Sequence, residues 1–452
     1  MEDLAGKNIL VLGLGRSGRS AAAYCAKQGA RVLAVDEQPS ESNHPELEGL
    51  AVVRSGIPFP SGAAFDLVIP SPGIPQEKIP ADSVCVWGDI ELAYRTTDVP
   101  FIAVTGTNGK STTTCLIEAM LTEAGIKTAA AGNIGIPILD VIDPSLEQVV
   151  VEVSSFQLET TETFKPAIAV LLNITPDHLD RHGSVDSYIS AKARVFAHQG
   201  KDDLLIANAG DPRVRELARS APGRVWTFHL SEPQEQGAWL DGDDIVMRID
   251  GREWRTVYEA EFLTGVHNAE NALASLLAAH AAGVPFDQSL NALQHFRGLP
   301  HRTELVRCLS GVRYIDDSKA TNVGAAVRAL ESFDTPVVWI AGGKDKGLDF
   351  RPLGAACANV RTVILMGEAG PQLEAALPLA VPRVMVANLD SAVIQAARLA
   401  EPNDVVLLAP ACASFDQFAN FEERGERFRA AVEALPEPGV SQLKAVRGGA
   451  SS

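Results

Sequence analysis

The N-terminal part of the chain alternates short apolar runs with a glycine-rich turn and a helical segment. Apolar residues predict strands over residues 7–12, 30–35 and 65–69. Glycines within residues 13–18 predict a tight turn after the first strand, and an alanine-rich stretch predicts a helix over residues 20–28. A strand, a turn, a helix and a strand in this order indicate a parallel α/β unit.

The central part of the chain repeats this pattern and then changes. Apolar runs again predict strands, and a glycine-rich loop separates the first of them from a helix. Alternating residues around a glycine turn predict a hairpin further on. The predicted elements are strands over residues 101–104, 148–153 and 168–173, a helix from about Ser111, a hairpin over residues 245–257 and a helix over residues 267–280.

The C-terminal third alternates apolar strands with helical segments, the strands at residues 312–315, 337–341, 362–366 and 405–409. This alternation predicts a parallel, doubly wound sheet. At roughly 100–200 residues per domain, a chain of 452 residues indicates about three domains. We expect three α/β domains over residues 1–94, 95–298 and 299–452, and a frayed tail from about residue 436.

Composition and charge indicate a globular protein and exclude some classes of partner. Hydrophobic residues make up 46% and charged residues 21%, a mixture that can fill several globular cores. The net charge of −18 argues against a broad contact with nucleic acid or anionic membranes, while a local cluster of cations can still bind a small anion. No apolar run approaches the roughly 20 residues of a membrane span, and no signal peptide is evident. Six cysteines without a CxxC pair indicate reduced thiols, so we expect a cytoplasmic protein that is not inserted in a membrane.

The strongest chemical motif is TGTNGKST at residues 105–112, between a predicted strand and a predicted helix. Phosphate oxygens bind to backbone N–H groups at a helix N-terminus, to a lysine at the outer phosphates and to a hydroxyl shared with Mg²⁺. The spacing is shorter than in the general P-loop, because Val104 stands where its first glycine would be. A glycine turn with an incidental lysine is the alternative. The candidate nucleotide-binding residues are Gly106, Thr107, Asn108, Gly109, Lys110, Ser111 and Thr112.

Two further motifs carry ionisable groups near this loop. Glu152 lies in an apolar strand, where a carboxylate must be paired, protonated or bound to a metal; a Mg²⁺ role is favoured over a salt bridge. His178 and His182 have the i, i+4 spacing of a zinc pair. However, no glutamate follows the first histidine as in HExxH, and no cysteine cluster lies nearby. We favour a single histidine, His178, near the nucleotide and metal, and a surface position is the plain alternative for His182.

The N-terminal GxGxxG pattern and Asp36 could indicate a dinucleotide site, with Asp36 on a ribose hydroxyl. A lone GxGxxG is weak evidence for NAD, and the second phosphate-binding loop argues against the hypothesis of a simple dehydrogenase. An NAD-dependent oxidoreductase nevertheless stays a rival hypothesis.

Taken together, the motifs resemble those of the Mur ligase family over essentially the whole chain. They are TGTNGKST, EVSSFQLE, NITPDHLDRH, AKARVF, GVHNAENALAS, GLPHRTE, DDSKATN, AGGKDKG and APACASFDQF, in the family's order. GLGRSG, DSKATN and ACASFDQF look most similar to the members that add D-glutamate to UDP-N-acetylmuramoyl-L-alanine in peptidoglycan precursor synthesis. The resemblance implies a UDP-binding Rossmann-like domain, a central ATP-binding P-loop domain and a C-terminal amino-acid-binding Rossmann-like domain. It also implies an ATP-dependent ligase, with Mg²⁺ (two ions) and an acyl-phosphate intermediate.

The resemblance also implies roles for individual residues. The catalytic residues would be Lys110, Glu152, His178 and Lys192, and the metal ligands Ser111, Glu152, His178 and a carbamylated Lys192. ATP would further contact Asn268, Asn271, Arg302 and Asp317. The UDP substrate would contact Gly15, Arg16, Ser17, Asp36, Gly73, Asn133 and His178. D-glutamate would contact Lys319, Thr321, Lys346, Ser414 and Phe421, with Lys344 as the alternative to Lys346.

Ordinary structural roles are alternatives to several of these functional assignments. Lys192 could be an ordinary solvated helix lysine, and Asn268 could be a helix cap. For the whole chain, the competing hypotheses are a sister Mur ligase, a folylpolyglutamate-type ligase and a catalytically inactive binding protein. The partners we expect are small molecules rather than nucleic acid, and the protein is expected to be a monomer.

Overall fold

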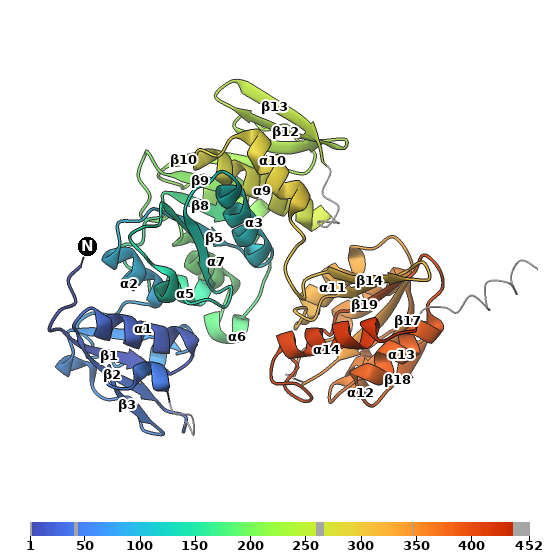
Figure 1. Cartoon of the computed structure of the whole chain (residues 1–452), viewed down its shortest axis with the longest axis horizontal. Coiled ribbons are helices and arrows are strands. Elements are labelled where there is room, and N and C mark those ends of the chain that lie inside the picture. The colour runs from blue at the N-terminus through green and yellow to red at the C-terminus, as the bar shows by residue number, and fades with distance from the viewer. Residues whose placement is uncertain (1, 40–43, 259–265, 346, 437–452) are drawn as a thin grey trace, which may run out of the picture. The chain divides into compact units, whose positions relative to one another are not determined.

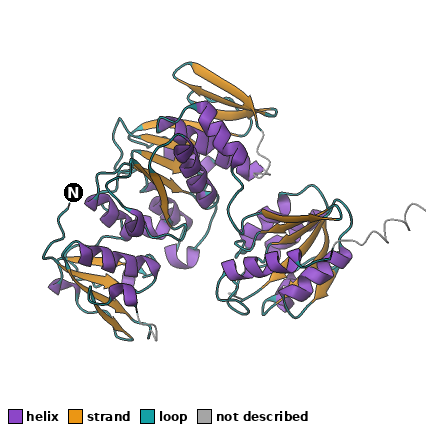
Figure 2. Ribbon diagram, in the orientation of Figure 1, coloured by secondary structure: helices purple, strands orange, loops and turns teal. Residues whose placement is uncertain are grey.

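The computed structural model describes residues 2–39, 44–258, 266–345 and 347–436 (Figures 1 and 2). The described residues up to Phe296 form one compact unit, and those from Arg297 onward form a second. Lys346 and the predicted tail beyond residue 436 lie outside the described residues. The α/β fold predicted from the sequence is confirmed.

The first sheet has four strands in the order β3-β2-β1-β4, all parallel. Strand β1 is almost wholly buried, as expected for a parallel sheet covered on both faces. Helix α1 begins at Arg16, inside the predicted glycine turn and earlier than the alanine run predicts. The elements are β1 (Asn8–Leu12), α1 (Arg16–Lys27), β2 (Arg31–Asp36), β3 (Val52–Ser55), β4 (Leu67–Pro70) and the connecting helix α2 (Asp89–Thr96).

The second sheet has nine strands in the order β13-β12-β11-β10-β9-β8-β5-β7-β6. Strands β5 to β10 are parallel and fully or largely apolar, whereas β11, β12 and β13 form antiparallel pairs, so the predicted hairpin is confirmed. The strands are β5 (Phe101–Thr105), β6 (Thr128–Gly132), β7 (Gln148–Glu152), β8 (Ile168–Leu171), β9 (Leu204–Asn208), β10 (Arg224–His229), β11 (Gly237–Asp241), β12 (Asp244–Ile249) and β13 (Arg252–Val257).

Helices cover this sheet, and α3, α9 and α10 pack against one another (Figure 1). The helices are α3 (Lys110–Glu123), α4 (Ile138–Val141), α5 (Ser155–Glu159), α6 (Leu179–His182), α7 (Val185–Ala193), α8 (Pro212–Ala218), α9 (Val266–Ala281) and α10 (Phe286–His295). One hydrophobic cluster includes residues of both sheets, for example Ile9 and Phe101. Because β5 lies between β7 and β8, the residues that follow these three strands meet at one edge of the sheet.

The second unit contains a six-stranded sheet in the order β14-β15-β19-β16-β17-β18. All pairs are parallel except β14 with β15, and hydrophobic clusters lie on both faces, so the doubly wound prediction is confirmed. The elements are β14 (Glu304–Leu309), β15 (Val312–Asp316), α11 (Val323–Glu331), β16 (Val337–Gly342), β17 (Val360–Met366), α12 (Gly370–Ala376), β18 (Arg383–Met385), α13 (Leu389–Leu399), β19 (Val405–Leu408) and α14 (Phe421–Glu433).

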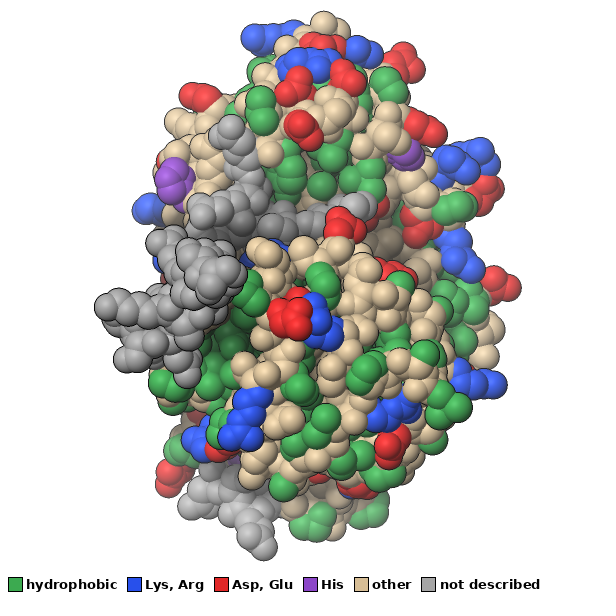
Figure 3. Space-filling model, turned by 90° about the vertical axis from the view of Figure 1, so that its right-hand side faces the viewer, with side chains coloured by type: hydrophobic (Ala, Val, Ile, Leu, Met, Phe, Trp, Pro, Cys, Tyr) green, Lys and Arg blue, Asp and Glu red, His purple; other side chains and the backbone are tan. Residues whose placement is uncertain are grey.

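Three separate sheets suit three domains, and we propose that the domain boundaries lie where the sequence predicts them. The boundary after residue 94 falls within α2, and the one after residue 298 falls close to the division at Arg297. Within the described part of the chain, no helix is long and apolar enough to cross a membrane. On the face shown in Figure 3, basic and acidic side chains are interspersed.

Candidate active site

The predicted phosphate loop connects the end of β5 to the start of α3. Gly109 is the N-cap residue of α3 and adopts a left-handed conformation, with φ of 82°. A Cβ atom on Gly109 would lie 2.2 Å from Asn271 Oδ1, so only glycine fits here. The backbone N–H groups of Thr107 and Asn108 donate to O and Oδ1 of Asn173, both at 2.9 Å. The segment after β8 therefore holds the loop in shape.

Lys110, Ser111 and Thr112 form the first turn of α3. Lys110 Nζ donates to the carbonyl oxygens of Gly106 at 3.1 Å and Thr107 at 2.9 Å, so the charged amine lies over the loop. The N-terminus of a helix offers backbone N–H groups and a positive dipole end to phosphate oxygens. A glycine loop, a helix N-terminus and a lysine in this arrangement fit the phosphates of a nucleotide.

Glu152, the last residue of β7, reaches this helix turn and is 1% exposed. Its Oε2 atom accepts a hydrogen bond from Ser111 Oγ at 2.5 Å, and its Oε1 atom accepts one from Asn133 Nδ2 at 2.7 Å. Both partners are neutral hydrogen-bond donors. A hydroxyl and a carboxylate are the hard oxygen ligands that Mg²⁺ prefers, and the residues present therefore fit this cation.

Lys192 projects from α7 and is buried, with 2% of its surface exposed, so the alternative of a solvated helix lysine is wrong. Its Nζ atom donates to Gly106 O at 2.8 Å and lies 4.7 Å from the centre of the Tyr188 ring. Burial lowers the pKa of Lys192 well below its usual range, and the nearby charge of Lys110 lowers it further. The two lysines thus contact the same carbonyl of the phosphate loop.

The two candidate histidines have different surroundings. His178 adopts a left-handed backbone conformation before α6, its side chain is 52% exposed, and its ring centre lies 5.0 Å from that of Phe156. His182 is buried: its Nε2 atom lies 2.9 Å from Ser155 Oγ and its Nδ1 atom 2.9 Å from Glu159 Oε1. The alternative of a surface position for His182 is wrong, because α5 covers it. Both its ring nitrogens are engaged, which also argues against a zinc pair.

Asn271 lies beside the phosphate loop, and Asn268 is its hydrogen-bond partner. Asn271 Oδ1 accepts a hydrogen bond from Thr113 Oγ1 at 3.3 Å, and Asn271 Nδ2 donates to Asn268 Oδ1 at 3.3 Å. Helix α9 begins at Val266, so Asn268 lies inside the helix and the capping alternative is wrong. Two buried amides at this position could contact a nucleotide base.

The close contact at Gly109 leads to a prediction. We expect Gly109→Ala to lower kcat/KM for ATP by about 10-fold or more, because the new Cβ would collide with Asn271 and strain a left-handed residue. Steady-state kinetics at varied ATP concentration measures this effect. Gly125→Ala is the matched control, since Gly125 has φ of 78° but no atom within 4 Å of its Cβ position. Equal ATP kinetics of the two variants would contradict the prediction.

The candidate UDP-binding residues surround the glycine turn of the first sheet. Asp36 Oδ2 accepts a hydrogen bond from the N–H of Leu14 at 2.7 Å, so this carboxylate also shapes the turn. Gly15 is the N-cap residue of α1, and Arg16 Nη1 donates to Gly135 O at 3.4 Å. Ser17 lies in the first turn of α1, and Gly73 is exposed in the loop after β4.

In the second unit, the candidate amino-acid-binding residues lie on loops after the strands. Lys319 Nζ lies 3.8 Å from the ring centre of Phe421, the first residue of α14. Ser414 is buried in the loop after β19, and Thr321 N donates to Lys319 O at 2.7 Å in the loop before α11. Lys344 is exposed, and its Nζ atom lies 2.6 Å from Glu368 Oε2.

Arg424 is a functional candidate that the sequence does not reveal. It is fully buried, and its guanidinium donates to the carbonyl oxygens of Ser318 at 2.9 Å, Cys412 at 3.1 Å and Ala413 at 3.3 Å. Its Nε atom donates to Ser318 Oγ at 3.0 Å, and this hydroxyl donates to the carbonyl of Phe421 at 2.8 Å. One side chain of α14 thus connects the loop that carries Lys319 with the loop that carries Ser414, and the Ser318 hydroxyl connects the first loop to Phe421 at the start of the helix.

We expect Arg424→Met to lower the free energy of unfolding by about 2–4 kcal/mol, because several buried acceptors lose their donor. Urea unfolding of the full chain measures the change. Arg427→Met is the matched control on the same helix, since Arg427 is exposed and its ion pair with Asp390 lies on the surface, where it contributes little to stability. Equal stability of the two variants would contradict the assigned role.

Arg302 and Asp317, the remaining ATP candidates, belong to the second unit. Burial raises the pKa of Asp317 to about 7, and the charge of Arg302 acts in the opposite direction. Asp317 Oδ1 accepts a hydrogen bond from the N–H of Thr303 at 3.3 Å. The two side chains therefore influence each other electrostatically.

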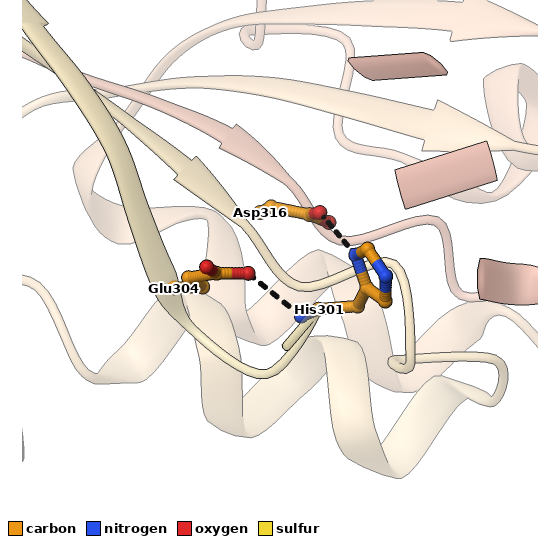
Figure 4. Close-up of side chains that lie close together, drawn as sticks. All are labelled: His301, Glu304 and Asp316. Carbon is orange, nitrogen blue, oxygen red and sulfur yellow. Dashed lines mark hydrogen bonds and ion pairs between the residues drawn. The ribbon is translucent and has the colours of Figure 1, made fainter. Parts of the chain in front are cut away.

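His301, Glu304 and Asp316 are close enough together to be possible metal ligands (Figure 4). His301 Nδ1 lies 2.7 Å from Asp316 Oδ2, a hydrogen bond that raises the pKa of His301, and Glu304 Oε2 accepts from the N–H of His301 at 3.0 Å. Asp316 Oδ1 accepts from the N–H of Ser318 at 2.8 Å, and Glu304 Oε1 pairs with Arg429 at 2.5 Å. All three side chains therefore have partners within the protein.

Comparison with known proteins identifies the family. The chain matches the models described as "Mur ligase middle domain" over residues 104–279 and "Mur ligase, glutamate ligase domain" over residues 301–412. A relative from Geobacter metallireducens is 44% identical over 446 residues, covering 96% of this chain and 98% of the relative. A relative from Pelotomaculum thermopropionicum is 41% identical over 452 residues, covering 96% and 99%. Both are named UDP-N-acetylmuramoylalanine–D-glutamate ligase.

The chain belongs to the Mur ligase family. It is therefore an ATP-dependent ligase that forms amide bonds, and the family predicted from the motifs is confirmed. Solved structures agree in fold. MurC from Thermotoga maritima has a TM-score of 0.60 at 20% identity and covers 95% of this Mur ligase and 99% of that chain. A pseudomurein peptide ligase type C from Methanothermus fervidus has a TM-score of 0.61 at 16% identity, with coverage of 95% and 99%.

Proposed function

We propose that this Mur ligase joins D-glutamate to the carboxylate of UDP-N-acetylmuramoyl-L-alanine, releasing ADP and phosphate. The observation that carries the proposal is the likeness over nearly the whole chain, at 37–44% identity, to relatives named after this reaction. The cluster of Lys110, Ser111, Glu152 and Lys192 at the phosphate loop agrees with it. The reaction belongs to peptidoglycan precursor synthesis.

The proposed reaction has two steps. A carboxylate oxygen of the UDP substrate attacks the γ-phosphorus of ATP, the bond to ADP breaks, and an acyl phosphate forms. The amine of D-glutamate then attacks the acyl carbon and loses a proton, and phosphate leaves. Positioning and neutralisation of charge would supply most of the acceleration. Lys110 and the N–H groups of the first turn of α3 would hold the transferred phosphoryl oxygens.

The metal roles are also proposals. Ser111, Glu152, His178 and a carbamylated Lys192 would hold two Mg²⁺ ions, which when bound would neutralise charge on the phosphoryl group. The contact between Ser111 and Glu152 supports a shared cation, and the burial of Lys192 supports a modified amine.

The substrate roles rest on position in the fold. Gly15, Arg16, Ser17, Asp36 and Gly73 lie around the glycine turn that would hold the uridine diphosphate, and Asn133 lies beside Glu152. For D-glutamate we propose Lys319, Thr321, Lys346, Ser414 and Phe421. Lys344 is already paired with Glu368, which favours Lys346 for the substrate carboxylate, although Lys346 lies outside the described residues. For ATP we propose Asn268, Asn271, Arg302 and Asp317 in addition to the loop.

The test is a phosphate-release assay with ATP, Mg²⁺ and UDP-N-acetylmuramoyl-L-alanine, with each amino acid supplied in turn. Release that requires D-glutamate, with a product heavier by one glutamyl unit, is the expected result. Release with another amine or acceptor would overturn the substrate assignment, and no release with any pair would overturn the function. We further propose that the enzyme acts on these small molecules as a cytoplasmic monomer, which light scattering of the purified protein tests.

A further inference from the structure

Asp89 is a buried carboxylate at the start of α2, the helix that connects the first sheet to the second. Only 3% of its surface is exposed. Its Oδ2 and Oδ1 atoms accept hydrogen bonds from Gln157 Nε2 at 3.0 Å and 3.3 Å, and Oδ1 also accepts the N–H of Ile90 at 3.0 Å. The side chain of Ser17 is close enough to lower the pKa of this carboxyl group, against the larger effect of burial. Because a buried carboxylate needs such partners, its position is closely defined.

Gln157 carries this connection into the second sheet. Its Oε1 atom accepts hydrogen bonds from both N and Oγ of Ser154, each at 3.1 Å, and Ser154 Oγ in turn accepts from the N–H of Gln157 at 3.2 Å. Together they form the capping box at the start of α5. Ser154 follows closely after Glu152, so the capping box begins just after the end of strand β7, which carries the proposed metal ligand.

Ser17 lies at the other end of this connection, in the first turn of α1 beside the glycine turn of the first sheet. Hydrogen bonds thus lead from Asp89 through Gln157 to Ser154, and Ser17 interacts with Asp89 at the other end of this chain. It connects the proposed UDP site to the strand end beside the phosphate loop. All four residues belong to the same compact unit.

We propose that Asp89 is a positioning residue that fixes the UDP-binding turn relative to the strand end carrying Glu152. The inference rests on the proposed function and goes beyond it, because Asp89 lies among protein groups and has no assigned part in the reaction. A UDP substrate held at the glycine turn must present its carboxylate at the phosphate loop. A rigid link between the two places sets that distance, and a shift of about 1 Å between reacting groups can cost about 100-fold in rate.

Two substitutions at Asp89 distinguish the effect of its hydrogen bonds from the effect of filling the site with a side chain. Asp89→Leu keeps the branching at Cγ and removes both acceptor oxygens, so we expect kcat to fall by about 10- to 100-fold with an unchanged KM for ATP. Asp89→Asn keeps an oxygen for Gln157 Nε2 and offers an N–H to the hydroxyl of Ser17, so it should retain near wild-type kcat. Burial raises the pKa of Asp89, which agrees with the site accepting a neutral amide.

The matched control is Glu91→Leu, on the same helix. Glu91 is equally buried, but its carboxylate accepts from Arg95 Nε and from the N–H groups of Glu162, Thr163 and Phe164 rather than from Gln157. Loss of the Glu91 carboxylate should lower stability. It should not lower kcat selectively while KM for ATP stays unchanged. Gln157→Met breaks the same link as Asp89→Leu from the other side, and serves also if Asp89→Leu does not fold. In the double variant, kcat should fall no further than in the more affected single variant.

The experiment is steady-state kinetics of phosphate release by the full chain, with thermal unfolding of each variant. Wild-type protein comes first: absence of release that depends on D-glutamate would refute the proposed function itself. With wild-type activity present, low kcat in Asp89→Leu and Gln157→Met, rescue in Asp89→Asn and a non-additive double variant would support the inference. Wild-type kcat in folded Asp89→Leu, a loss equal to that of Glu91→Leu, or additive losses in the double variant would overturn it.

Discussion

Glu152→Gln is expected to lower the rate of ATP-dependent phosphate release by about 100- to 1000-fold, the loss typical of removing one preorganised charge-stabilising group. Glutamine has the same length and can still accept the hydrogen bond from Ser111, so the fold should persist. What it lacks is the negative charge. A divalent cation binds anionic oxygens far better than an amide, and Glu152 presents its carboxylate beside the phosphate loop at only 1% exposure.

The measurement is phosphate release as a function of Mg²⁺ concentration. The variant should need more Mg²⁺ for half-maximal rate and should remain slow at saturation, while its circular dichroism stays that of the wild type. Glu91→Gln is the matched control, because Glu91 is a buried carboxylate whose partners include Arg95 and the Thr163 hydroxyl rather than the phosphate loop. If Glu152→Gln kept the Mg²⁺ dependence of Glu91→Gln, a metal role for Glu152 would be excluded.

The phosphate loop and Glu152 could be predicted from the sequence because each depends on local chemistry. A glycine-rich loop with a lysine and a hydroxyl, between an apolar run and a helix, has the groups that phosphate binding requires, and a carboxylate within an apolar strand needs a partner. The structure adds which partners these are. Ser111 and Asn133 contact Glu152 because β7 lies between β5 and β6, an order that adjacent residues in the sequence do not encode.

His182 and Arg424 could not be predicted in the same way, because their surroundings come from distant parts of the chain. His182 is buried against Ser155 and Glu159 of α5. Arg424 lies in a run of charged residues whose composition indicates a solvated helix face. Nevertheless, its partners are carbonyl oxygens of the loops at Ser318 and Cys412. A polar residue is predicted to be exposed unless the fold that buries it is known.

Several strands also escaped prediction for physical reasons. Strand β6 has the sequence TAAAG, without β-branched residues other than its first, and β3 is an edge strand whose valines are exposed. Pairing with neighbours stabilises both as strands. The alanines of β6 have little preference for a strand, so tertiary contacts decide the outcome there. The two valines of β3 favour a strand, but the run is too short to be recognised from the sequence.

Lys192→Arg is expected to reduce phosphate release by about 100- to 1000-fold, on the hypothesis that the active form of Lys192 is a carbamate. Burial and the charge of Lys110 lower the pKa of Lys192, so that more of the amine is neutral near pH 7 than for an exposed lysine. A neutral amine attacks carbon dioxide: an N–C bond forms, the nitrogen loses a proton, and the product is an anion. Arginine keeps the positive charge and the length but stays protonated and cannot form this carbamate.

The comparison of Lys192→Arg with Lys201→Arg separates a carbamate from a cation at this position, since Lys201 is exposed and should tolerate the exchange. Wild-type activity should fall when carbon dioxide is removed and return with bicarbonate, and mass spectrometry at neutral pH should find one added carboxyl group on the peptide of Lys192. Wild-type turnover of Lys192→Arg would refute the hypothesis. A cation that contacts Gly106 would then explain the buried lysine. The sign of the charge at Lys192 therefore decides its electrostatic effect on the transferred phosphoryl group. A carbamate would oppose the positive charge of Lys110 there, and an ammonium group would add to it.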